Sequence, residues 1–225
     1  MVAPKSPLPA VGLTPSELTA VVAPANLMSM EFLLFDCETT GLPRSRHFSP
    51  DDVSGWPHLV QLAWALYDAK GSRLESHTHI VKPQGFRIPA DATRIHGISH
   101  DHAVEVGEDL GQVITRFMAA ASRPSITIVA HNLDYDRYVV MAELIRLGHN
   151  HASLEIPGIC TMKTTTDLCA LARPGGYGFK WPTLSELHVY VFGSEYEGAH
   201  DAGRDLEACA RCFFKLLEAG HYKVA

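Results

Sequence analysis

One short apolar run, residues 32–35, leads directly into two acidic residues, Asp36 and Glu38. The run predicts a buried strand, and residues i and i+2 of a strand project from the same face, with Cα atoms roughly 6.6 Å apart. Two carboxylates that face one spot at a buried strand end repel each other and lose hydration, which costs free energy unless a proton or a cation intervenes. A bound divalent metal ion would neutralise this repulsion most simply. The alternative is an acidic strand end that faces water.

The composition is that of one well-packed globular domain, because the 225 residues are 46% hydrophobic and 20% charged. No apolar run approaches the roughly 20 residues that a membrane-spanning helix requires, so no membrane partner is expected. The five cysteines are odd in number and irregularly spaced, which does not suit a secreted disulfide framework. We therefore expect an intracellular, cytoplasmic protein.

The first 28 residues differ from the rest of the chain, because prolines recur there among alanine and other small residues. This composition predicts a flexible tail over residues 1–28, with a short helical turn at 16–22. The globular domain is then expected to span residues 29–225.

Hydrophobic patterning predicts a mixed α/β sheet with helices beside it. Residues 173–181 read as a glycine-rich loop, and the pattern of 162–172 favours no element. Strands are predicted at 59–67 and 73–81, joined as a hairpin, and at 125–130 and 159–161. Helices are predicted at 92–97, 108–121 and 183–192, from the 131–136 segment to 147, and from the 198–205 segment to 217.

Further acids follow a strand or open a helix, where open α/β sheets place their sites. Asp134 and Asp136 come directly after the strand at 125–130. Residues i and i+2 of a helix point to different sides, so only one of them can join the first two acids. For either, the alternative is a helix N-cap, a position that aspartate favours. Asp205 lies near the start of the last helix, where the alternative is an acid that complements the helix dipole.

Two other patterns are expected to be structural. Cys209 and Cys212 form a C-x-x-C, but positions i and i+3 of a helix commonly face a core, and no second pair lies at zinc-finger spacing. His77 and His79 share one face of a predicted strand, and a histidine pair without a third ligand favours a wet sheet face over a metal site.

Three segments, residues 36–41, 131–136 and 200–205, together resemble the three sequence motifs of the DEDDh 3′-to-5′ exonucleases. This superfamily includes ribonuclease T and the proofreading exonuclease subunit of DNA polymerase III. Residues 95–98, Ile-His-Gly-Ile, resemble the family's segment beside the terminal nucleotide. The resemblance extends from about residue 30 to 220 and implies a ribonuclease-H-like α/β fold, a five-stranded mixed sheet with an antiparallel second strand and flanking helices.

The resemblance also implies roles for individual residues. The spacing of the second motif selects Asp136 over Asp134. His200 would be the general base, since the branch that uses tyrosine needs one four residues before the last acid, where Asp201 stands here. Two Mg²⁺ or Mn²⁺ ions would be bound by Asp36, Glu38, Asp136 and Asp205. The terminal nucleotide would be held by Thr39, Gly41, Ile95, His96 and Asn132. Tyr135 stands where the family usually has phenylalanine.

The implied function is metal-dependent hydrolysis that releases nucleoside monophosphates from the 3′ end of DNA, at single-stranded or frayed ends. An RNA-trimming 3′-to-5′ exoribonuclease is the alternative, because no motif here separates DNA from RNA. A catalytically silent nucleic-acid-binding domain is a second alternative. The net charge of −6 predicts weak, short-footprint binding and low processivity. The chain ends about twenty residues after Asp205, so no polymerase-binding tail is expected.

Overall fold

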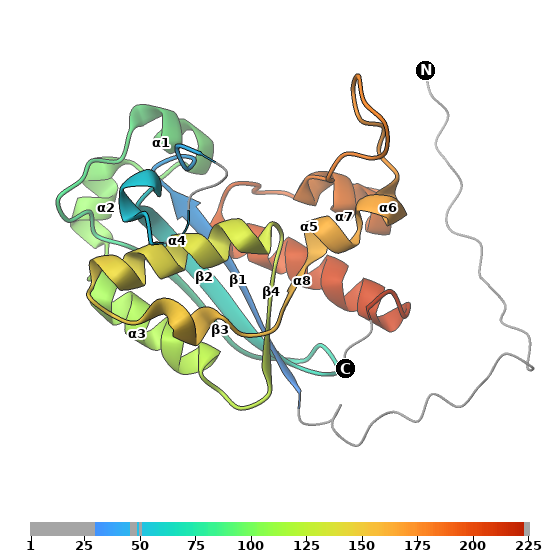
Figure 1. Ribbon diagram of the computed structural model, residues 1–225, viewed down its shortest axis with the longest axis horizontal. Helices are drawn as coiled ribbons and strands as arrows, with labels where there is room; N and C mark the ends of the chain where they lie inside the picture. Colours follow the sequence, from blue (N-terminus) through green and yellow to red (C-terminus); the bar gives the residue numbers. More distant parts are fainter. Residues whose placement is uncertain (1–29, 46–48, 50, 223–225) are drawn as a thin grey trace, which may run out of the picture.

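The computed structural model describes residues 30–45, 49 and 51–222; the predicted tail and its helical turn lie outside these residues. One five-stranded sheet forms the centre, in the order β3-β2-β1-β4-β5 (Figure 1). β1 pairs antiparallel with β2 and parallel with β4, β2 pairs antiparallel with β3, and β4 pairs parallel with β5. The strands are β1 (Glu31–Thr39), β2 (Leu59–Asp68), β3 (Arg73–Ile80), β4 (Ile126–Ala130) and β5 (Gly158–Cys160). The predicted mixed sheet with an antiparallel second strand is confirmed.

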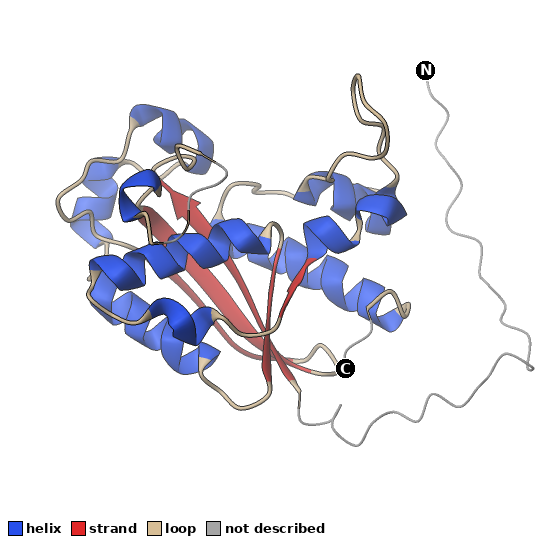
Figure 2. Ribbon diagram, in the orientation of Figure 1, coloured by secondary structure: helices blue, strands red, loops and turns tan. Residues whose placement is uncertain are grey.

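Helices cover both faces of this sheet (Figure 2). The α-helices are α1 (Ala90–His96), α2 (His100–Val106), α3 (Leu110–Ala121), α4 (Leu133–Arg146), α5 (Thr161–Thr164), α6 (Thr166–Cys169), α7 (Leu184–Phe192) and α8 (Ala202–Glu218). The described residues also include the 3-10 helices η2 (Val53–Gly55) and η3 (His151–Leu154).

The alternation of side chains along β1 assigns each face to its own helices. Leu33 and Phe35 are buried in the cluster that includes the apolar faces of α3 and α4. Phe32 and Leu34 are buried in a second cluster with α8, where Phe213 packs edge-on against Phe32. Because the side-chain period of a strand is two residues, Asp36 and Glu38 continue the face that α8 covers.

The prediction missed two parts of the helical structure. α2 follows α1 after an N-cap at Ser99, whose side chain accepts a hydrogen bond from the His102 backbone N–H. Only Ala103 of this helix is buried. The sequence of α2 therefore lacks the periodic pattern of apolar residues from which a helix is predicted. The segment 162–172, for which no element was predicted, contains most of α5 and all of α6, each only one turn long.

The cysteine pair and the histidine pair both pack within the protein. Cys209 and Cys212 are buried thiols of α8. The His77 ring stacks on the buried Trp64 at a centroid distance of 4.8 Å, and the His79 ring lies tilted against it at 5.0 Å, so the expectation of a wet sheet face is wrong in part. Within the described residues no helix is both long and apolar enough to cross a membrane.

Candidate active site

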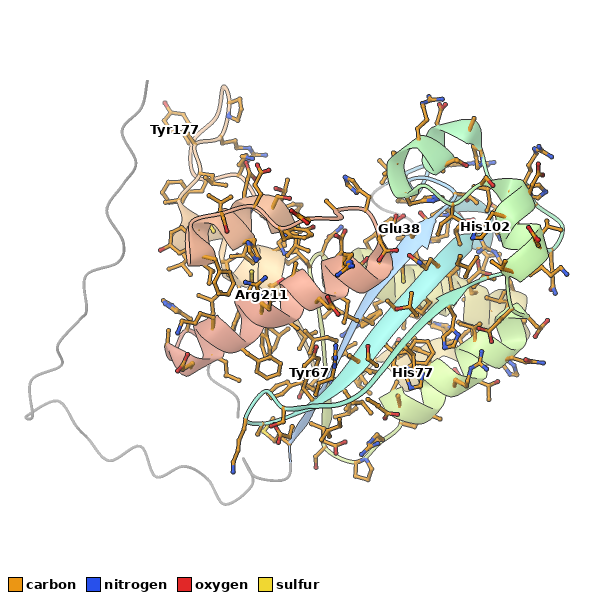
Figure 3. The ribbon with its side chains drawn as sticks, turned by 180° about the vertical axis from the view of Figure 1, so that it is seen from behind. Glu38, Tyr67, His77, His102, Tyr177 and Arg211 are labelled. Atoms are coloured by element: carbon orange, nitrogen blue, oxygen red, sulfur yellow. The ribbon has the colours of Figure 1, made fainter. Side chains whose placement is uncertain are left out.

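The C-terminal half of β1 brings the first two motif acids to one place. Asp36 and Glu38 lie on the face of β1 that α8 covers, and Glu38 is buried. Figure 3 shows Glu38 near the end of β1, close to the start of α8. Because β4 runs parallel to β1 and leads directly into α4, the second motif opens its helix at the same edge of the sheet.

The first turn of α4 brings Asp136 to β1 and turns Asp134 away. The Cys37 backbone N–H donates a hydrogen bond of 3.1 Å to Asp136 Oδ1, and Asp136 is 3% exposed. The Asp134 side chain is 52% exposed and forms an ion pair with Lys163 on α5. Only Asp136 therefore lies with the acids of β1.

The third motif supplies Asp205 and His200 from the start of α8. Asp201 is the N-cap of this helix, and its side chain accepts a hydrogen bond from the Arg204 backbone N–H. The carboxylate of Asp205 accepts hydrogen bonds from the His200 backbone N–H at 3.2 and 3.3 Å and from the Tyr196 hydroxyl at 2.8 Å. His200 has a φ of 69°, an uncommon left-handed conformation for a residue other than glycine, which these hydrogen bonds stabilise.

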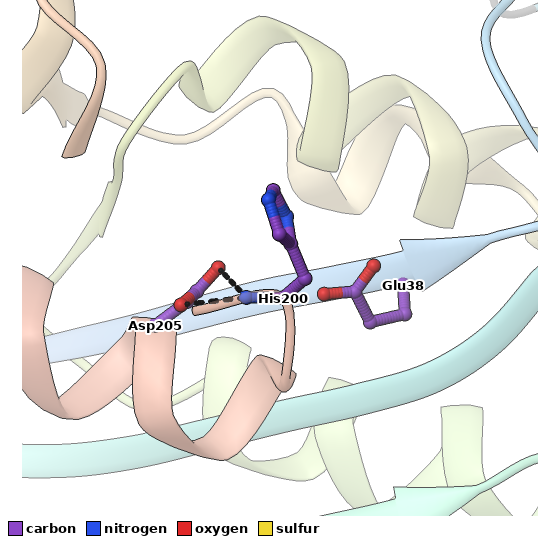
Figure 4. Close-up of side chains that lie close together, drawn as sticks. All are labelled: Glu38, His200 and Asp205. Carbon is purple, nitrogen blue, oxygen red and sulfur yellow. Dashed lines mark hydrogen bonds between the residues drawn. The ribbon is translucent and has the colours of Figure 1, made fainter. Parts of the chain in front are cut away.

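Glu38, His200 and Asp205 form the one cluster of potential metal ligands found among the described residues. One ligand atom of each lies within 4.8 Å of the others (Figure 4). Asp36 and Asp136 lie outside this trio but act on it electrostatically. His200 itself is exposed, so its ring is open to solvent while the acids beneath it are buried or partly buried.

The acids raise one another's pKa values. Burial, and then the carboxylates of Asp136, Asp205 and Glu38, raise the pKa of Asp36 well above its usual range. Burial, and then Asp205 and Asp201, raise the pKa of Glu38 to about 8. Burial also raises the pKa of Asp205 and, against the opposing hydrogen bonds from Cys37, that of Asp136. Among the described residues, no lysine or arginine forms an ion pair with any of the four motif acids.

These raised pKa values give the metal-free protein a defined pH dependence. The folded protein holds the Glu38 proton up to about pH 8, whereas the unfolded chain releases it near pH 4.5. The free energy of unfolding is therefore expected to decrease as pH rises through this window. Thermal unfolding in EDTA between pH 5 and 8 measures the effect, and Glu38→Gln should flatten the dependence. A melting temperature that rises equally with pH in both proteins would contradict the prediction.

The turn after β1 holds two of the predicted substrate residues in a hydrogen-bonded network. The Tyr135 hydroxyl lies 2.6 Å from Thr39 Oγ1 and 2.8 Å from the Gly41 carbonyl oxygen, and Thr39 Oγ1 lies 2.7 Å from the same carbonyl. The hydroxyl groups of Thr39 and Tyr135 therefore both donate their hydrogen bonds within the protein. Gly41 has a φ of 145°, which side chains rarely permit. The tyrosine that departs from the family pattern therefore fixes the shape of this turn.

Tyr135→Phe, which installs the residue usual in the family, is expected to raise KM about 2- to 10-fold while kcat changes little, since the turn loses a hydrogen bond of modest net strength. Steady-state kinetics on a single-stranded oligonucleotide measure the effect. Tyr138→Phe, on the same helix, is the matched control. Unchanged KM together with a lowered melting temperature would show that the hydroxyl serves stability alone.

The remaining predicted substrate residues lie on α1 and at the start of α4. Ile95 is 59% exposed, an unusual position for a large apolar side chain. His96 is buried, and burial lowers its pKa while the Thr39 backbone partly offsets this. Its Nδ1 accepts a hydrogen bond from the Ile98 backbone N–H. Asn132 is the N-cap of α4 with a φ of 78°, and its side chain makes no capping hydrogen bond.

Two residues that contact the site, Tyr196 and Gln61, lie outside the three sequence motifs. Tyr196 donates to Asp205 from a loop between α7 and α8. Gln61 on β2 accepts a hydrogen bond of 2.9 Å from the Ala202 backbone N–H, and its amide nitrogen lies 3.4 Å from Asp201 Oδ2. Gln61 thereby aligns the start of α8 with the sheet, and Asp201 raises the pKa values of Asp36 and Glu38. No local pattern marks Gln61, because its partners are about 140 residues away.

Comparison with known proteins agrees with this geometry. The profile of the RNase T family, described as exonuclease, matches residues 33–213. Among curated proteins no sequence matches the chain significantly. The zinc-bound complex of E. coli exonuclease I with single-stranded DNA superposes with a TM-score of 0.67 at 23% identity, over 84% of this chain and 41% of that chain. Exonuclease I from Methylocaldum szegediense superposes with a TM-score of 0.67 at 23% identity, over 84% and 40%.

These superpositions confirm the predicted ribonuclease-H-like fold. The chain spans less than half the length of the exonuclease I structures that it matches, and at this identity the likeness concerns the fold. The family match, in contrast, covers most of the chain and includes all three motifs. The chain therefore belongs to the RNase T family of exonucleases, the DEDD-type 3′-to-5′ exonucleases that its motifs resemble.

Proposed function

We propose that the chain is a metal-dependent 3′-to-5′ exonuclease that releases nucleoside monophosphates from single-stranded or frayed ends of DNA. The observation that carries the proposal is the grouping of Glu38, His200 and Asp205 within 4.8 Å of one another, beside two more motif acids. Membership of the exonuclease family supports the reaction. The single-stranded oligonucleotides bound to exonuclease I, such as dT13, support the substrate class.

The donor set fits two Mg²⁺ or Mn²⁺ ions. Hard divalent cations prefer oxygen ligands, and buried carboxylates without a cationic side chain need positive charge near them. The ions would be held by Asp36, Glu38, Asp136 and Asp205. When bound, they would activate the attacking water and stabilise the leaving 3′ oxygen.

His200 is placed to act as the general base. Its ring is exposed beside Glu38 and Asp205, and its backbone N–H is held by the Asp205 carboxylate. A neutral imidazole accepts the proton of the attacking water near neutral pH. Tyr196 holds Asp205 from the other side, so the relative position of acid and base depends on two hydrogen-bond donors.

The terminal nucleotide would lie between the end of β1 and α1. The exposed Ile95 offers an apolar surface to its base. Asn132 offers an amide that capping does not use. The turn from Thr39 to Gly41, together with His96, shapes the remaining wall.

An assay on 5′-end-labelled single-stranded DNA, single-stranded RNA and a duplex with a frayed 3′ end tests the proposal. With Mg²⁺ or Mn²⁺ we expect a ladder of products shortened from the 3′ end and released mononucleotides, and EDTA should abolish both. Cleavage of RNA alone would identify an exoribonuclease instead. Binding of the labelled strands without any metal-dependent product would identify a silent nucleic-acid-binding domain.

The cysteines favour an intracellular, cytoplasmic setting for this activity. All five are buried free thiols, which a reducing compartment maintains. Nucleic-acid 3′ ends are available in the same setting.

A further inference from the structure

A hairpin between α6 and α7 carries three aromatic side chains that do not enter the core. The aromatic hairpin, residues 171–181, is closed by a bridge between Ala172 and Phe179 and by a hydrogen bond of 2.9 Å from the Lys180 backbone N–H to the Leu171 carbonyl. Tyr177 at its tip is fully exposed, Trp181 is 56% exposed and Phe179 is 45% exposed. Large apolar side chains grouped on a surface indicate a binding surface.

The segment that forms the aromatic hairpin contains basic residues and no acidic ones. No acidic residue occurs from Leu168 to Ser185, a stretch that contains Arg173 and Lys180 in a chain of net charge −6. Lys180 Nζ lies 2.5 Å from Glu186 Oε1, so the base of the hairpin is tied to the first turn of α7. Exposed aromatic rings beside basic side chains are the chemistry by which proteins stack the bases of single-stranded nucleic acids.

The aromatic hairpin is anchored to the candidate active site through His131. One ring nitrogen, Nε2, lies 3.0 Å from the Pro182 carbonyl oxygen, and Nδ1 lies 2.9 Å from Thr161 Oγ1. Burial lowers the pKa of His131 to about 4, so the neutral ring donates from Nε2 to the carbonyl and accepts from the threonine hydroxyl. His131 precedes Asn132, and Pro182 follows Trp181, so this bond joins the substrate segment to the hairpin.

The hairpin and α1 lie on opposite sides of the acids. In Figure 1 the orange loop rises on one side of the molecule, while α1 and α2 lie on the other. Figure 3 shows the same order from behind, with Glu38 between Tyr177 and His102 of α2. A strand whose 3′ end lies against α1 can therefore continue toward the hairpin.

We propose that the aromatic hairpin binds single-stranded nucleic acid by stacking bases upstream of the 3′ end, with Trp181 and Tyr177 as the principal contacts. This inference rests on the proposed function, because it concerns the strand that the acids would shorten. Stacking adds affinity in a chain whose net charge of −6 does not favour binding to phosphates. The stacking part of the affinity is expected to depend less on salt than the part that comes from phosphate contacts.

Trp181→Ala and Tyr177→Ala test the inference against oligo(dT) of about 12 nucleotides. Each is expected to raise KM for this substrate about 5- to 100-fold without changing kcat, in proportion to the stacking lost. The rate of Tyr177→Ala on a dinucleotide should stay the same, because Tyr177 lies at the hairpin tip, whereas Trp181 lies at the base that His131 joins to the substrate segment. Trp181→Phe should retain most of the affinity, and Leu74→Ala, an exposed apolar residue on β3, is the matched control.

Fluorescence anisotropy of labelled oligo(dT) in EDTA separates this inference from the proposed function. If the wild type binds oligo(dT) and both alanine variants bind it more weakly, the result supports the proposed role of the hairpin, even if no cleavage is found. Cleavage by the wild type with KM and anisotropy unchanged in both alanine variants overturns it. An equal loss by Tyr177→Ala on the dinucleotide overturns it as well, because the tyrosine ring would then act at the acids or on the fold.

Discussion

Asp136→Asn is expected to reduce exonuclease activity on the order of 10³-fold or more, whereas Asp134→Asn should leave it nearly unchanged. Metal-ion catalysis contributes several kcal/mol of transition-state stabilisation, and each 1.36 kcal/mol corresponds to a factor of ten in rate. Asp136 is the acid that lies against β1, while Asp134 faces Lys163 at the surface. The pair thus compares two carboxylates two residues apart on one helix.

Asp136→Asn is expected to keep the fold, so a loss of activity in this variant reports on the active site. Its side-chain oxygen can still accept the hydrogen bond that the Cys37 backbone N–H gives to Asp136. Removal of one carboxylate also relieves repulsion with Asp36 and Glu38. Both variants should therefore unfold at or above the wild-type temperature in EDTA, apart from the small loss of an exposed ion pair in Asp134→Asn. Equal losses of activity in the two variants would show that the second motif is assigned in the wrong register.

His200→Ala is expected to lower the rate about 10²- to 10⁴-fold while a measurable activity remains, because this is the usual contribution of a positioned general base. Only the neutral imidazole ring accepts a proton. The wild-type rate should therefore fall at acid pH, and this limb of the pH profile should flatten or move in the variant. His102→Ala, on the exposed surface of α2, is the control.

Metal binding distinguishes a base from a ligand at this position. Calorimetric titration with Mn²⁺ should give the same affinity for His200→Ala as for the wild type, whereas Asp205→Ala should bind the ion more weakly. His200 lies within 4.8 Å of two of the proposed ligands, so a weakened Mn²⁺ affinity in His200→Ala would identify it as a ligand instead. If His200→Ala keeps the wild-type rate and the wild-type pH dependence, His200 is a structural residue before α8.

The local elements that carry the motifs were readable from the chain. A strand has a side-chain period of two residues, so Asp36 and Glu38 had to share a face once the apolar run at 32–35 was identified as a strand. The helix after β4 likewise separates Asp134 from Asp136 by its own geometry. The helix predicted at 183–192 is present as α7, where Thr183 and Glu186 form a capping box. These features depend on residues close together in sequence, and their geometry follows from backbone periodicity.

Tertiary structure decided the contacts that complete the site. Gln61 and Asp201 are 140 residues apart, and Tyr135 joins Thr39 across 96. Tyr196 and His200 reach Asp205 from a loop with no periodicity, and His200 holds a left-handed backbone that only its surroundings stabilise. The exposed aromatic hairpin also lay in a segment that reads as a loop. Partners such as Gln61 and Asp201 are far apart in sequence, so the periodicity of a single helix or strand cannot predict that they meet. The packing of the helices on the sheet determines which of these polar groups form hydrogen bonds.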